Sequence, residues 1–218
     1  MSGNTKKILV ATTNPGKAAE LQAMLDADVN WLTLADFPDI PEVKEDGTTF
    51  IENASKKALG YAKATGLWTI ADDSGLVIDA LDAAPGIESA RFSGVKSPDR
   101  TLIDHKNIAK VLELLKGVPF DKRTARFVCS LCLANPDEIL IQTQGTLEGL
   151  ITEKEIGENG FGYDPVFFVP HMDKTVAQLN REEKNAISHR GNAIRKLKPL
   201  LAQLLKNSEV ECDKTSKN

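Results

Sequence analysis

The segment IADDSG at residues 70–75 places two adjacent carboxylates, Asp72 and Asp73, and the hydroxyl of Ser74 directly after a short apolar run. Asp, Ser and Gly are also typical of turns, because their short side chains bond to nearby backbone groups. Alternatively, a buried strand delivers a carboxylate to a cleft as a metal ligand or general base, since open α/β sheets bind ligands near their strand ends. In a continuing strand the two aspartates point to opposite faces, so we expect one of them in a site.

The segment TTNPGK at residues 12–17 could hold a phosphate group. Its pattern predicts a strand that passes through a tight turn into a helix, where free backbone N–H groups and the positive end of the helix dipole favour an anion. Lys17 adds a full charge, and the side chains of Thr12 and Asn14 add donors. The Walker A pattern is absent, so this is not a P-loop.

The helix expected to follow Thr49 offers a second lysine. Thr49 with Glu52 three residues later matches the capping box at a helix start. Glu52 and Lys56 are four residues apart and are expected to form a pair on the helix surface. Lys57 lies about 100° further round, above Asn53, so its side chain can point into a cleft and contribute a second cation for a polyphosphate.

The segment GFGYDP at residues 160–165 could contact a planar base. Its two glycines let the backbone approach a ligand closely, and the ring of Phe161 or Tyr163 can stack on a base. Asp164 precedes a proline and is therefore expected to be extended. Taken alone, this segment is also typical of the start of an aromatic strand.

The segment SHRG at residues 188–191 lies within a long helix expected over residues 181–206. His189 and Arg190 together present donors that could bind a carbonyl edge. The 6-keto group of hypoxanthine and xanthine would accept these hydrogen bonds, whereas the 6-amino group of adenine would leave them unpaired.

Acidic residues suggest a divalent cation. Glu45 lies in a Pro-rich, acidic loop without an obvious partner. Mg²⁺ takes one or two carboxylates together with phosphate oxygens and water. Glu45 with Asp72 or Asp73 could therefore hold Mg²⁺.

Composition limits the classes of protein. The chain has 218 residues, 41% of them hydrophobic, which suffices for one sizeable α/β core, and its net charge of −4 argues against a binder of duplex nucleic acid. It has no membrane-length apolar run and no signal-peptide pattern, so we expect a cytoplasmic protein that does not contact a membrane. Cys129 and Cys132 lie on a predicted strand and face opposite sides, as buried structural thiols would.

Strands and helices alternate early in the chain and give way to a hairpin later, which predicts an α/β fold with a mixed sheet and helices on both faces. We expect one catalytic domain over residues 1–206 and a polar tail over residues 207–218. The expected strands cover residues 7–13, 29–36, 67–74, 75–81 and a hairpin at 124–151, and the expected helices cover residues 14–26, 48–65, 97–117 and 181–206.

Four segments in this order closely resemble the inosine/xanthosine triphosphate pyrophosphatase family: TTNPGK; GTTFIENASKKA leading to IADDSGL; DAAPGIESARFSG; and GFGYDPVFF leading to REEKNAISHRGNA. The resemblance extends from residue 7 to about residue 205. It implies a two-lobed, elongated fold around a long mixed sheet with the site between the lobes, a homodimer, and Mg²⁺-dependent hydrolysis of deaminated purine nucleoside triphosphates to monophosphate and pyrophosphate.

The resemblance also implies roles for individual residues. Asp73 is expected to be the general base, Glu45 and Asp73 to hold the metal, and Ser74 to touch the substrate, while Asp72 supports the turn or a neighbouring side chain. The expected phosphate ligands are Thr12, Thr13, Asn14, Pro15, Gly16, Lys17 and Lys57, and the expected lining of the nucleotide pocket is Phe161, Gly162, Tyr163, Asp164, Lys184, His189 and Arg190. Thr13 replaces a glycine that is more usual in the family, which changes how closely the backbone can approach a phosphate.

Other functions fit parts of the pattern. A related pyrophosphatase could prefer another base, such as a modified pyrimidine. A nucleotide sensor without turnover would need the same cations, but it would gain little from a carboxylate beside a polyphosphate. A single-strand nucleic-acid binder would need a charged groove with several aromatic side chains, and most of the aromatic residues here have apolar neighbours.

Overall fold

A mixed sheet runs through the molecule. In the part of the chain that the computed structural model describes, residues 5–25 and 27–215, seven strands pair in the order β2-β1-β3-β4-β5-β6-β7. The strands are β1 (Lys7–Ala11), β2 (Asn30–Thr33), β3 (Trp68–Ile78), β4 (Thr124–Ala134), β5 (Ile139–Ile151), β6 (Phe167–Val169) and β7 (Lys174–Thr175). β1 is parallel to β2 and β3, and the pairs from β3 to β7 are antiparallel. The expected mixed sheet is confirmed.

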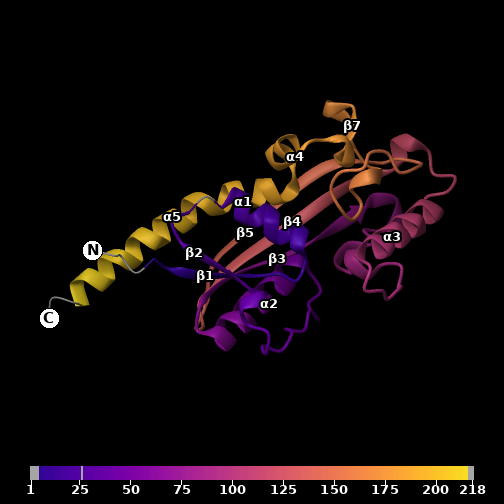
Figure 1. Ribbon diagram of the computed structural model, residues 1–218. Helices are drawn as coiled ribbons and strands as arrows, with labels where there is room; N and C mark the ends of the chain where they lie inside the picture. Colours follow the sequence, from indigo (N-terminus) through magenta and orange to yellow (C-terminus); the bar gives the residue numbers. More distant parts are fainter. Residues whose placement is uncertain (1–4, 26, 216–218) are drawn as a thin grey trace.

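Helices cover both faces of the sheet (Figure 1). They are α1 (Pro15–Met24), α2 (Phe50–Thr65), α3 (Arg100–Leu114), α4 (Arg181–Ile187) and α5 (His189–Thr215). Alternate residues of β1 show the arrangement: Ile8 and Val10 pack in a cluster with α1 and α5, whereas Leu9 and Ala11 pack against α2. Among the described helices, none is both long enough and apolar enough to cross a bilayer.

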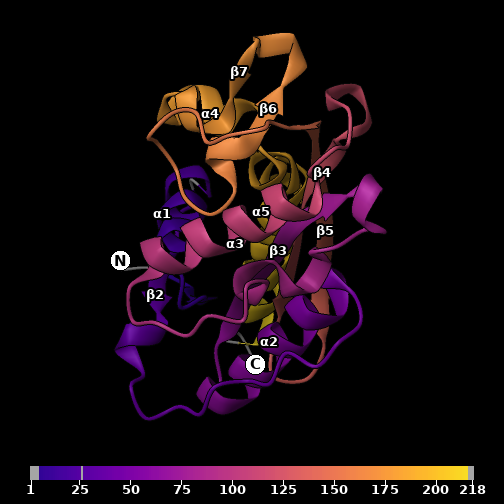
Figure 2. The ribbon, with the colours of Figure 1, turned by 90° about the vertical axis from the view of Figure 1, so that its right-hand side faces the viewer.

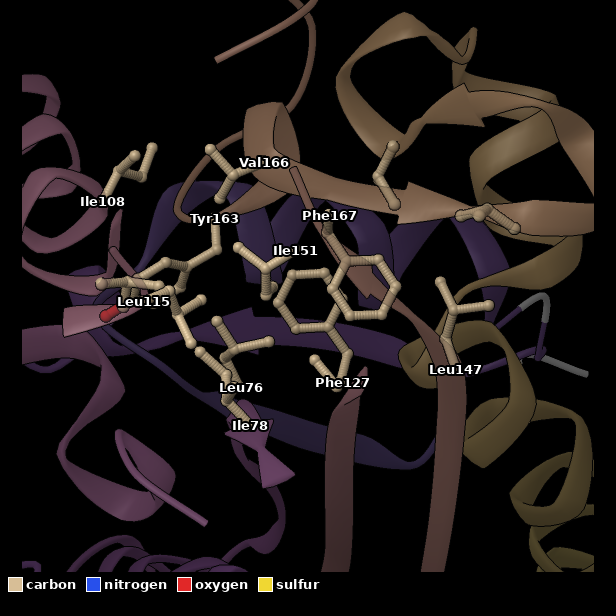
Figure 3. Packing of buried hydrophobic residues seen from close by; sticks show 14 residues of the cluster. Leu76, Ile78, Ile108, Leu115, Phe127, Leu147, Ile151, Tyr163, Val166 and Phe167 are labelled. Carbon is tan, nitrogen blue, oxygen red and sulfur yellow. The ribbon is translucent and has the colours of Figure 1, made fainter. Parts of the chain in front are cut away.

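Polar side chains separate two apolar clusters along one face of β3. Ile70 packs in the cluster of α1 and α5, while Leu76 and Ile78 pack in a second cluster beneath α3. Figure 3 shows this second cluster, in which the rings of Phe127 and Phe167 stack with centroids 4.3 Å apart. The residues of β3 between the two clusters are therefore the ones that the fold leaves for a polar site.

β3 passes straight through the IADDSG segment. The prediction of two strands with a possible turn between them is wrong, because Trp68–Ile78 is one strand. It pairs with β4 without interruption from Thr69 opposite Ala134 to Ile78 opposite Ala125. The hydrogen bonds of this long ladder outweigh the local preference of Asp, Ser and Gly for turns.

The predicted last helix is two helices. Ser188 has an extended backbone, with φ −62° and ψ 153°, and separates α4 from α5. Its Oγ accepts a hydrogen bond from the N–H of Gly191 at 3.0 Å, as an N-cap residue does. The SHRG segment therefore starts a helix instead of lying inside one.

α5 also continues to Thr215, beyond the expected end at residue 206, and the segment 207–215 contains no glycine or proline to stop it. The last three residues of the expected tail, 216–218, lie outside the described residues.

Candidate active site

One pocket gathers most of the residues singled out from the sequence. They come from the β1–α1 turn, α2, β3, the loop before β6, α4 and α5. The predicted residues that line the pocket are Thr12, Thr13, Asn14, Lys17, Glu45, Lys57, Asp73, Ser74, Phe161, Gly162, Tyr163, Asp164, Lys184, His189 and Arg190. Gly16 lies behind this lining, where a Cβ would come 2.8 Å from the ring of Phe161. The lining also includes residues that the sequence did not suggest, four of them charged: Glu42, Arg91, Arg100 and Asp104.

Asp73 faces α2, where Lys57 and Glu45 surround it. The Nζ of Lys57 lies 2.9 Å from Glu45 Oε2 and 3.8 Å from Asp73 Oδ1. Asp73 Oδ2 is buried and has no hydrogen-bond partner among the described residues. Burial raises the pKa of Asp73 to about 6, although Lys57 opposes the change. The carboxyl therefore titrates near neutral pH, as a general base should.

Asp72 faces the opposite side of β3 and lies in a buried ion network. It pairs with Lys17 and with Arg190, whose Nε is 3.1 Å from Asp72 Oδ2. The thiol of Cys129 also donates to Oδ2 at 3.1 Å. Burial opposes ionisation of Asp72, but Arg190 and Lys17 outweigh it and hold the pKa of Asp72 below its usual value. Asp72 thus anchors cationic side chains and supports no turn.

Arg190 is buried and all three of its guanidinium nitrogens are engaged. Nε binds Asp72, Nη1 binds Glu20, and Nη2 donates to Ser74 Oγ at 2.9 Å. Glu20 also lies 2.9 Å from the Nζ of Lys184. Arg190 therefore holds two carboxylates and Ser74 together. Glu20 was missed from the sequence, since one glutamate a turn after Lys17 resembles any helical charge.

The start of α1 is capped from within. Asn14 Oδ1 accepts hydrogen bonds from the N–H groups of Gly16 at 2.9 Å and Lys17 at 3.2 Å. The expectation of free amides at this helix start is wrong for these two residues, because the Asn14 side chain satisfies them. The N–H of Asn14 in turn donates to Thr12 Oγ1 at 3.2 Å. A phosphate here would meet the Lys17 ammonium and the helix dipole.

Lys57 points into the pocket as predicted, but its neighbours on α2 differ from the prediction. Lys56 binds Asp46 at 2.6 Å instead of Glu52. The Thr49 Oγ accepts the N–H of Glu52, which confirms Thr49 as the N-cap. The carboxylate of Glu52 accepts hydrogen bonds from the backbone N–H of Thr48 at 2.7 Å and from the Thr48 hydroxyl at 2.9 Å.

His189 is a buried residue of the pocket lining. Its ring stacks on Phe127 with centroids 4.8 Å apart, and its Nδ1 is buried without a partner among the described residues. Burial and the nearby Arg190 charge lower the pKa of His189 well below its usual value, so the ring is neutral. A neutral imidazole has one donor and one acceptor, and the donor could bind a keto group.

The loop before β6 carries two aromatic rings: Phe161 faces the pocket, and the ring of Tyr163 is buried in the core. The hydroxyl of Tyr163 donates to the carbonyl of Ser89 at 2.9 Å, and its ring is buried. Phe161 is half-buried, and the Nζ of Lys184 lies 4.5 Å from its ring centroid. Asp164 is not extended; it starts a 3-10 helix, η5 (Asp164–Val166), and its Oδ2 accepts the N–H of Phe161 at 2.9 Å.

Two carboxylates of the pocket lining, those of Glu45 and Asp73, suit a divalent cation. The orphaned Oδ2 of Asp73 is available as a ligand, and Glu45 lies on the other side of Lys57. No cluster of three or more His, Cys, Asp or Glu side chains that could hold a metal occurs within residues 5–25 and 27–215. This set fits Mg²⁺, because Mg²⁺ takes few carboxylates and completes its shell with phosphate and water oxygens.

Comparisons with known proteins give one consistent result. A protein named dITP/XTP pyrophosphatase from Listeria monocytogenes serotype 4b (strain F2365) is 48% identical to this chain over 200 residues. The match covers 91% of this chain and 96% of that protein. Its counterpart from Exiguobacterium sp. (strain ATCC BAA-1283 / AT1b) is 50% identical over 201 residues, covering 92% and 99%.

Solved structures agree with the sequence matches. A HAM1 protein from Coxiella burnetii superposes with a TM-score of 0.81 at 41% identity, covering 91% of this chain and 100% of that one. A nucleoside-triphosphatase / dITP/XTP pyrophosphatase from Mycobacterium abscessus gives 0.72 at 43% identity, covering 88% and 99%. The Ham1 family model matches residues 8–200, and the chain therefore belongs to the Ham1 family.

Proposed function

We propose that this protein hydrolyses deaminated purine nucleoside triphosphates, ITP, dITP and XTP, to the monophosphate and pyrophosphate, and so removes them from the nucleotide pool. The observation that carries the proposal is the pair of oppositely set aspartates on β3. Asp73 has an unpartnered oxygen and a pKa near 6 beside Lys57. Asp72 holds Lys17 and Arg190 from the other face. The names of the relatives support the same reaction.

Asp73 would act as the general base. The carboxylate of Asp73 accepts a proton from a water molecule as the water oxygen attacks the α-phosphorus. A new P–O bond to the water oxygen forms, and the bond between the α-phosphorus and the oxygen bridging to the β-phosphate breaks. Pyrophosphate leaves with that bridging oxygen, and Asp73 releases the proton to solvent before the next turnover.

Lysine side chains would bind the phosphates. Lys17 at the start of α1 and Lys57 on α2 both line the pocket, so a polyphosphate between them meets cations from two sides. Fixed positive charge of this kind stabilises the extra negative charge of the transition state. Mg²⁺ held by Glu45 and Asp73 would neutralise phosphate charge when bound.

His189 and Phe161 would recognise the base. A donor on the neutral ring of His189 would bind a 6-keto group, and adenine would leave that donor unpaired. Phe161 is half-buried at the pocket wall and would stack on the purine. Arg190 contributes mainly by fixing Ser74 and Asp72, because each of its nitrogens is already engaged.

Pyrophosphate release from ITP, XTP, GTP and ATP with Mg²⁺ tests the proposal, using the intact protein and Asp73→Asn. The matched control is Asp39→Asn, since Asp39 is exposed and lies outside the pocket. We expect fast release from ITP and XTP, little from GTP or ATP, and a loss of at least about 1,000-fold in Asp73→Asn only. An intact protein that bound ITP without releasing pyrophosphate would instead be a nucleotide sensor.

We also propose that the protein works in the cytoplasm as a homodimer. The nucleotide pool supplies the proposed substrates there, and the resemblance to the pyrophosphatase family supports the dimer. Light scattering of the purified full chain at several concentrations tests the oligomeric state. A monomer mass at every concentration would contradict the dimer without affecting the proposed reaction.

A further inference from the structure

One face of α3 carries polar side chains that contact both walls of the pocket. Arg100, Asp104 and Asn107 are spaced four and three residues apart and therefore lie on one helix face. Asp104 is 13% exposed and Asn107 is buried, which is unusual for polar residues of a surface helix. Figure 2 shows α3 crossing in front of the sheet beside the loop that leads to β6.

Asp104 holds the loop that carries Phe161. Its Oδ2 accepts the N–H of Gly162 at 2.8 Å, and its Oδ1 lies 3.1 Å from the Nε of Arg100. Gly162 has φ +62°, a left-handed conformation that suits glycine and fixes the direction of its N–H. Because Asp164 binds the preceding N–H, of Phe161, two successive amides of this loop are each held by a carboxylate.

The same helix holds the opposite wall, the 3-10 helix η3 (Gly86–Arg91). Asn107 Nδ2 donates to the carbonyl of Ser89 at 3.3 Å, and its Oδ1 accepts the N–H of Ser93 at 2.7 Å. The carbonyl of Ser89 also accepts a hydrogen bond from the Tyr163 hydroxyl, and Ser89 lines the pocket. α3 thus links η3 and the Phe161 loop through side-chain hydrogen bonds to both.

We propose that Asp104 is a positioning residue for base recognition: through the N–H of Gly162 it fixes the Phe161 loop against the pocket, so that affinity for the base depends on a side chain of α3. This inference rests on the proposed function. Asp104 bonds to the N–H of Gly162 and pairs with Arg100, and not with Lys17 or Lys57, so it should affect base binding and leave pyrophosphate binding unchanged. A merely structural residue would affect both.

Calorimetric binding of IMP and of inorganic pyrophosphate to the full chain, with Mg²⁺, separates these effects. The variants are Asp104→Ala, Asp104→Asn and, as a control on the same helix, Glu113→Ala, whose side chain is exposed. Loss of the acceptor for the part-buried N–H of Gly162 predicts about tenfold weaker IMP binding in Asp104→Ala. Asp104→Asn keeps a neutral acceptor and should lose about threefold. Pyrophosphate binding and the control should match the unmodified protein.

A double-mutant cycle with Phe161→Ala adds a second readout. If Asp104 acts through the Phe161 ring, Asp104→Ala should weaken IMP binding less than about twofold once that ring is gone. Full additivity of the two changes overturns the inference, as does unchanged IMP affinity in Asp104→Ala or an equal loss for both ligands. If the alanine variant does not fold, wild-type IMP affinity in Asp104→Asn overturns it. An unmodified protein that binds neither ligand and hydrolyses no triphosphate overturns the proposed function and this inference together.

Discussion

Replacing Asp73 with asparagine is expected to stabilise the metal-free protein at neutral pH. Burial raises the pKa of Asp73 from 3.8 to about 6, so its ionised form is less stable in the folded protein than in the unfolded chain. A pKa difference of about 2 corresponds to roughly 3 kcal/mol. Asparagine has nearly the same shape and no charge. We therefore expect Asp73→Asn to raise the free energy of unfolding by about 1–3 kcal/mol at pH 7.

The sign of this effect sets its pH dependence. Above about pH 6, Asp73 is ionised in both states and its full cost is present. Between about pH 6 and pH 4 the folded protein takes up a proton that the unfolded chain does not, and the cost falls. Below about pH 4 both states are protonated, so the advantage of asparagine disappears. Urea unfolding of both proteins in the presence of a chelator measures the difference. Equal stability at pH 7, or an advantage that grows towards acid, would refute the reasoning.

The adjacent residue provides a control of opposite sign. Asp72 is buried between Lys17 and Arg190, and its pKa is lowered because those charges outweigh the cost of burial. Asp72→Asn removes the countercharge of Lys17 and leaves Arg190 paired with Glu20 alone, and it should destabilise the protein by about 3 kcal/mol or more at pH 7. The same unfolding experiment should therefore show opposite changes for two neighbouring aspartates.

Two further substitutions test the pocket. Gly16→Ala would place a Cβ 2.8 Å from Cε1 of Phe161, so the ring must move. We expect the KM for ITP to rise about tenfold, while the free energy of unfolding changes by less than about 1 kcal/mol. An unchanged KM would contradict the contact. Lys57→Met removes the cation beside Asp73 and Glu45, and kcat for ITP should fall about 100-fold in steady-state assays, whereas Lys63→Met, on the exposed side of α2, should leave it unchanged.

Local signals made parts of the fold predictable. The helix expected over residues 97–117 is present as α3, with Asp99 as its N-cap and Gly117, at φ +81°, just beyond its end. The hairpin formed by Thr124–Ala134 and Ile139–Ile151 also follows the prediction. In each case the residues that set the boundary are close together in the chain, so their preferences act without help from the rest of the fold.

Long-range contacts decided what the sequence could not show. The continuation of β3 through its two aspartates depends on β4, more than 50 residues later. Glu20 looks like an ordinary helical charge until α5 brings Arg190 against it, 170 residues along the chain. Asp104 likewise resembles a solvent-facing residue of an amphipathic helix, and its partner, the N–H of Gly162, carries no sequence signal.

The two aspartates of β3 differ because strand geometry gives them different neighbours. Side-chain alternation sends Asp72 towards α1 and α5, which supply Lys17 and Arg190, and sends Asp73 towards α2, which supplies Lys57. Each of these cations has a carboxylate partner within the protein. A polyphosphate that draws Lys17 away from Asp72 leaves Arg190 in place, so Asp72 stays ionised and paired while the substrate binds. The carboxylate with surplus cations is therefore the anchor, and the carboxylate with an unpartnered oxygen is the one free to accept a proton.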